Sequence, residues 1–143
     1  MPAHRHTRAL RHRDRWPAAL CVLVAGLTHV PLIPDHLEEA PYVGALFIAL
    51  AVVALGLAAA LVLHDSSLVW ALVVAVMGAA VIAFLVSRTI GLPQMPDDVG
   101  NWFGEAMGLP AITAETLAAA IGTTVLVRPR RHRPAVAAPR RLG

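Results

Sequence analysis

The sequence predicts an all-α integral membrane protein, an antiparallel four-helix bundle with both termini in the cytoplasm. The chain of 143 residues is 57% hydrophobic and only 15% charged, whereas a soluble domain is about half apolar and about a quarter charged. Its apolar residues are gathered into four runs that are long enough for membrane-spanning helices. Its arginines are concentrated at the two ends, and placing both ends on one side of a membrane requires an even number of spans.

The predicted helices cover residues 16–33, 43–63, 68–90 and 112–127. Together they form one transmembrane domain, residues 16–127, with no room for a separate soluble domain. A basic N-terminal tail (1–15) precedes it. A basic, Pro- and Ala-rich C-terminal tail (128–143) follows it and is expected to be disordered.

The first run follows an arginine-rich segment, which also allows a signal peptide. Its apolar core is longer than the usual hydrophobic region of a signal peptide, however, and no A-x-A-like site follows Ile33. We therefore expect the first helix to remain in the mature protein. Pro17 in its first turn is tolerated there, because the first N–H groups of a helix have no intrahelical partner.

Local signals mark the limits of the other helices. Pro41 stands just before the second helix. Asp65, Ser66 and Ser67 offer N-cap oxygens to the third, and the turn 64–67 is short enough to make these two helices antiparallel. Gly91, followed by Pro93, ends the third helix. In the fourth helix, small residues at four-residue spacing predict close helix packing: Ala114, Ala118 and Gly122.

The distribution of charge predicts orientation and partners. Eleven of the twelve Lys+Arg residues are arginines in or beside the two tails, which places both tails in the cytoplasm and the protein in the plasma membrane. The tails are expected to contact anionic lipid headgroups. Nucleic acid is not an expected partner, since no folded basic module with interleaved aromatics is present. Most acids instead fall in the two predicted external loops: Asp35, Glu38, Glu39, Asp97, Asp98 and Glu105.

A polar stretch at residues 29–42 interrupts the apolar runs with two histidines, three carboxylates and three prolines. His36 and Glu39 are three residues apart and would share one face of a helical turn. With His29 as a third ligand they could coordinate a divalent metal ion such as zinc, iron or manganese. A solvated loop, with His29 bonded to a backbone carbonyl freed by a proline, explains the same residues without a ligand.

Arg88 is the charged residue well inside the third helix, and Glu115 lies in the first turn of the fourth predicted helix. An ion pair of Arg88 with Glu115 or Glu39 would lock two helices together or hold an anionic ligand. Alternatively, Arg88 reaches the headgroups, and Glu115 complements the positive end of its helix. What favours a site is that these residues and both histidines map to one outer layer of the bundle.

Two segments carry a resemblance to other proteins. The chain reads H-L-E-E-A-P-Y-V-G from His36 and S-R-T-I-G-L-P from Ser87. It thereby resembles a group of small, uncharacterised four-helix membrane proteins of high-GC actinobacteria, which carry H-L-x-E-A-P-Y-x-G and S-R-T-x-G-L-P segments. The resemblance implies the four-helix architecture and no particular activity.

The sequence alone therefore favours a multi-pass membrane protein whose His/Glu/Arg cluster near the outer leaflet binds a metal ion or small ligand. The alternative is a non-enzymatic accessory or assembly subunit of a larger membrane complex, as a homo-oligomer or with another membrane protein. A transporter is less favoured, because the ionisable residues crowd one boundary of the membrane. An enzyme is also less favoured, because no nucleophile–base motif appears and the single Cys21 excludes disulfide exchange.

Overall fold

The computed structural model describes residues 13–128, which form helices joined by turns and one longer loop. In chain order the elements are α1 (Arg15–His29), η1 (Val30–Leu32), α2 (Ile33–Glu39), α3 (Pro41–Leu63), α4 (Ser67–Thr89), η2 (Pro96–Asp98) and α5 (Gly108–Val127). Four helical stretches are long and apolar enough to cross a membrane, with α1 to α2 counted as one. The prediction of an all-α chain with four such helices is confirmed, and it fits a multi-pass membrane protein. Nearly all of the predicted tails lies outside the described residues.

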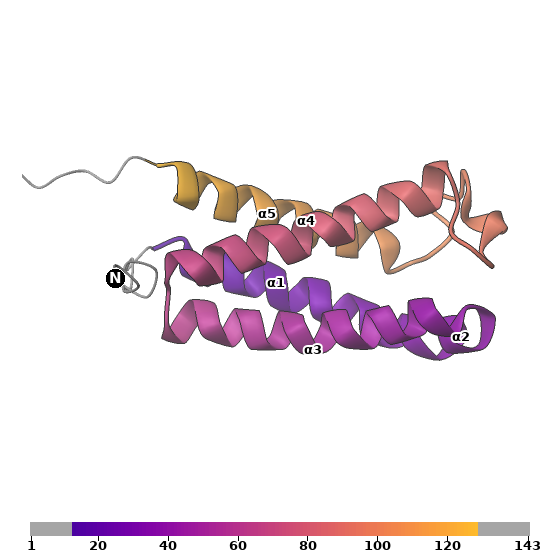
Figure 1. Cartoon of the computed structure of the whole chain (residues 1–143), viewed down its shortest axis with the longest axis horizontal. Coiled ribbons are helices and arrows are strands. Elements are labelled where there is room, and N and C mark those ends of the chain that lie inside the picture. The colour runs from indigo at the N-terminus through magenta and orange to yellow at the C-terminus, as the bar shows by residue number, and fades with distance from the viewer. Residues whose placement is uncertain (1–12, 129–143) are drawn as a thin grey trace, which may run out of the picture.

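The helices run alternately up and down the long axis of the molecule (Figure 1). α2 and the loop between α4 and α5 lie at one end, which we call the loop end; the α3–α4 turn lies at the other. α1 packs along α3 and α5, and α4 packs along α5. α3 and α4 make few contacts although they are consecutive, because they meet at their turn and diverge toward the loop end.

The turn between α3 and α4 uses Ser66, one of the three predicted cap residues, as the N-cap. The Ser66 side chain accepts a hydrogen bond of 3.4 Å from the Val69 N–H, which satisfies one of the unpaired donors of the first turn. The indole N–H of Trp70 donates to Asp65 at 2.7 Å, and both side chains are buried. The turn is therefore tied to the first turn of α4, which keeps α3 and α4 antiparallel.

Small residues bring the helices close together. A Cβ placed on Gly26 of α1 would lie 2.8 Å from the Cβ of Ala54 on α3, and one on Gly122 of α5 would lie 2.7 Å from Val74 on α4. The predicted stripe of α5 is buried in full: Ala114, Ala118 and Gly122. Close backbone approach of this kind gains dispersion contacts where no hydrophobic effect drives helices together.

The first helical segment extends beyond its predicted end. We expected residues 16–33 to be followed by a loop, but the chain continues through η1 and α2 as far as Glu39. Each short helix has a proline in its first turn, where a missing N–H costs nothing. α2 then folds against α3 at Gly44, where an added Cβ would lie 2.8 Å from the backbone nitrogen of Leu37.

The loop between α4 and α5 folds back over the loop end. The Gly100 N–H donates to the carbonyl of Arg88 at 2.9 Å, and the Tyr42 hydroxyl donates to the carbonyl of Pro93 at 2.7 Å. Met95, 3% exposed, packs in a small core with Ala40 and Val43. These contacts place the acidic residues of the loop over the ends of the helices.

α5 begins at Gly108, four residues before the predicted start at 112. Glu115 is therefore the eighth residue of its helix and not part of the first turn. Its carboxylate is 2% exposed. The interaction with the positive helix end, which falls off within the first turn, does not account for this residue.

Candidate functional site

Two histidines at the loop end adopt the same local arrangement. The Nδ1 atom of His29 lies 2.8 Å from the carbonyl of Ala25, and that of His36 lies 2.8 Å from the carbonyl of Leu32. A carbonyl oxygen only accepts, so Nδ1 carries the proton in both rings. The Nε2 atoms are therefore the free ends of both imidazoles. Both histidine side chains are buried.

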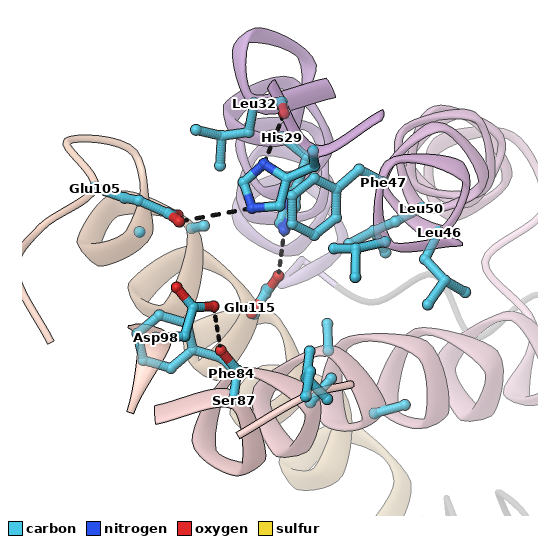
Figure 2. Close-up of a pocket in the computed structure, with 18 of the residues that line it drawn as sticks. His29, Leu32, Leu46, Phe47, Leu50, Phe84, Ser87, Asp98, Glu105 and Glu115 are labelled. Atoms are coloured by element: carbon cyan, nitrogen blue, oxygen red, sulfur yellow. Dashed lines mark hydrogen bonds and ion pairs between the residues drawn. The ribbon is translucent and has the colours of Figure 1, made fainter. Parts of the chain in front are cut away.

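Each free Nε2 atom faces a carboxylate. His29 Nε2 lies 3.7 Å from Glu115 on α5, and His36 Nε2 lies 3.6 Å from Glu105 in the loop. The ring of Phe47 from α3 stands beside both imidazoles, with centroid distances of 4.7 Å to each. Side chains from three helical segments and the loop thus meet around one aromatic ring (Figure 2).

Arg88, near the end of α4, is 4% exposed and lies between two loop carboxylates. Its Nη1 atom is 2.7 Å from Asp98 Oδ1, and its Nη2 atom is 3.4 Å from Glu105 Oε1. Asp98 also accepts a 2.8 Å hydrogen bond from the Ser87 hydroxyl. The guanidinium carbon lies 5.2 Å from the ring centroid of Phe84, within the range of a cation–π contact.

The pairing of Arg88 is incomplete. Its contact with Asp98 is close, but its angles do not make it a hydrogen bond, and the buried Nε–H has no acceptor among the described residues. Buried donors of this kind are normally satisfied. Arg88 is therefore the group in this region with unused capacity to donate.

These side chains form the polar end of a cavity of about 430 Å³ between α3 and α4. We define the polar cluster as His29, His36, Arg88, Asp98, Glu105 and Glu115. The rest of the wall is mostly apolar and comes chiefly from facing residues of α3 and α4, among them Leu46, Leu50, Val76 and Ala83. Figure 2 shows Glu105 and Glu115 directed toward the imidazoles beside Phe47, and Asp98 directed toward Ser87.

Four of the five predicted site residues line this cavity: His29, His36, Arg88 and Glu115. Glu39 does not line it and is exposed on α2. Within residues 13–128, no group of three or more His, Cys, Asp or Glu side chains is placed so that it could hold a metal ion. The metal site expected from His29, His36 and Glu39 is thus not assembled, because Glu39 faces away from the cavity that the histidines line.

The expected partner of Arg88 was Glu115 or Glu39, and the structure gives it Asp98 and Glu105 instead. The reason is the fold of the loop, which returns its acids to the end of α4. Glu115 faces His29. Sequence reasoning assigned Asp98 and Glu105 only to the external acidic face. The signal that could have placed them is an arginine in an apolar helix followed within seventeen residues by a glycine-rich acidic loop.

Comparison of the chain with protein-family models, curated proteins and solved structures gave no significant match. The resemblance to small actinobacterial membrane proteins therefore stays a prediction.

Proposed function

We propose that this is a plasma-membrane protein with four spans and cytoplasmic termini that binds a small amphiphilic molecule in the cavity between α3 and α4. The arginine-rich tails support this orientation, because cytoplasmic segments carry an excess of Arg and Lys. The loop end, with the polar cluster, then lies near the outer face of the membrane.

The observation that carries the proposal is that a largely apolar cavity ends in a buried polar cluster. Its volume of about 430 Å³ falls in the usual range for small-molecule sites, about 300–1,000 Å³. Such sites combine apolar walls with a few convergent polar groups that orient the ligand. Ionisable residues in membrane-spanning segments are costly, and they commonly mark a functional site.

The position of the cavity favours an amphiphile over a water-soluble ligand. α3 and α4 pack little against each other toward the loop end, so the apolar wall lies between helices that would face lipid. An alkyl chain can enter between them from the bilayer, while a polar head remains at the cluster near the interface. A soluble ligand would leave this apolar wall without a matching surface.

The test is photolabelling in lipid nanodiscs with a monoacylglycerol that carries a diazirine in its alkyl chain. Ala83→Trp places an indole in the apolar part of the cavity, whereas Ala75→Trp adds the same group to an exposed position of α4 outside it. Labelling of cavity residues should be lost with Ala83→Trp and retained with Ala75→Trp. Equal labelling of both variants would reject the proposal.

The orientation has its own test. In a Cys21→Ala background, Glu39→Cys places a thiol on the exposed side of α2. A membrane-impermeant maleimide added to intact cells should label this thiol. Labelling only after the cells are broken would reverse the proposed topology.

A role as an accessory or assembly subunit is the second candidate, favoured by the limited packing of α3 against α4. A partner helix could cover the apolar surface that this leaves. Affinity purification after cross-linking in the membrane distinguishes the two functions. A stoichiometric membrane partner that is lost with Ala83→Trp and kept with Ala75→Trp would favour assembly over ligand binding.

A further inference from the structure

The hydrogen-bonding groups of the polar cluster restrict the kind of head that the cavity can accept. The proton on Nδ1 of His29 and His36 leaves a lone pair on each Nε2 atom when the ring is neutral. The facing carboxylates of Glu115 and Glu105 are also acceptors when ionised. Two acceptors cannot bond to each other, and separations of 3.7 and 3.6 Å exceed hydrogen-bond length. A hydroxyl hydrogen beside either pair therefore finds an acceptor.

Arg88 has the opposite requirement. Its buried Nε–H lacks an acceptor among the described residues, and the side chain lines the cavity. The complementary head therefore supplies donors to the two histidine–glutamate pairs and an acceptor to Arg88. A hydroxyl group does both, because it has one donor hydrogen and two lone pairs.

The charge of the cluster works against an anionic head. Arg88 is one fixed cation beside two carboxylates, Asp98 and Glu105. A carboxylate or phosphate head would add negative charge where negative charge already exceeds positive, in surroundings with little water to screen it. An ammonium head would suit the charge, but it offers no acceptor to Arg88.

We infer that the ligand is a single-chain amphiphile with an uncharged polyol head, of the monoacylglycerol class. This inference rests on the proposed function and specifies the ligand of the same site. The hydroxyls lie at the polar cluster, and the alkyl chain lies along the apolar wall between α3 and α4. The cavity is at the lower end of the usual volume range, which favours one chain over two.

The experiment measures competition on the unmodified protein in nanodiscs. The diazirine-bearing monoacylglycerol is displaced by three unlabelled competitors with the same alkyl chain and a glycerol ester, a carboxylate or a primary ammonium head. The glycerol ester should compete at least about tenfold better than the other two, since each of them leaves cluster groups unpaired. Equal or better competition by the carboxylate or the amine overturns the inference.

The same measurements separate the class of ligand from the existence of the binding site. If an anionic or cationic head competes best while Ala83→Trp still abolishes labelling, the cavity binds an amphiphile of another class and the proposed function stands. If labelling is insensitive to Ala83→Trp, the proposed function fails as well. Within the cluster, Glu105→Gln removes one negative charge at constant size and should improve carboxylate competition several-fold. Glu39→Gln, outside the cavity, should leave the order of competitors unchanged.

Discussion

Replacing Arg88 with methionine tests whether its ion pairs hold the α4–α5 loop over the cavity. Arg88 is 4% exposed, and its partners Asp98 and Glu105 have side chains that are 14% and 25% exposed. Removing one partner of a buried pair typically costs about 3–5 kcal/mol, because the opposite charge is left uncompensated. Since both carboxylates keep some contact with solvent and Ser87 still donates to Asp98, we expect the lower end, about 3 kcal/mol.

The assay is equilibrium unfolding in mixed micelles at increasing SDS fraction, followed by far-UV circular dichroism. Asp98→Asn and the double variant complete a cycle with Arg88→Met, and a coupling free energy of about 0.5–3 kcal/mol is expected for residues in direct contact. Arg128→Met is the matched control. Its pair with Asp14 spans 3.0 Å but has side chains that are 60% and 35% exposed, so its loss should cost at most about 1 kcal/mol. A cost for Arg88→Met no larger than that of the control, or strict additivity with Asp98→Asn, would refute the reasoning.

Two further predictions concern the packing that positions the cavity. Gly26→Ala should destabilise the protein by about 1–3 kcal/mol in the same unfolding assay, because the new methyl group would lie 2.8 Å from the Cβ of Ala54, which cannot rotate away. Gly56→Ala, with nothing within 4 Å of the added Cβ, should be neutral or stabilising by up to about 1 kcal/mol, and equal effects of the two changes would contradict the close α1–α3 packing. Trp70→Phe should cost about 1–3 kcal/mol by removing the buried 2.7 Å hydrogen bond to Asp65. An unchanged unfolding midpoint would show that this bond does not stabilise the turn.

The polar cluster contains both kinds of residue, those that sequence patterns located and those that they did not. His29 and His36 stood out because imidazoles are rare between apolar runs, and Arg88 stood out because it interrupts one. Glu39 matches the same sequence pattern, yet its side chain is exposed. The sequence could not predict this, because the periodicity of a seven-residue helix does not show which of its faces is covered. Asp98 and Glu105 have the sequence pattern of ordinary loop acids, and only the fold of the loop brings them to Arg88.

The sequence by itself determined the helical class, the number of apolar helices and the segment that caps α4, because these depend on composition, run length and short-range hydrogen bonds. Only the tertiary structure decided which carboxylate meets which cation. That pairing depends on the path of residues 90–107, which is held by long-range contacts such as the bond from Tyr42 to Pro93. It also depends on the divergence of α3 and α4, which leaves the cavity open. Both features arise from packing between segments far apart in the chain.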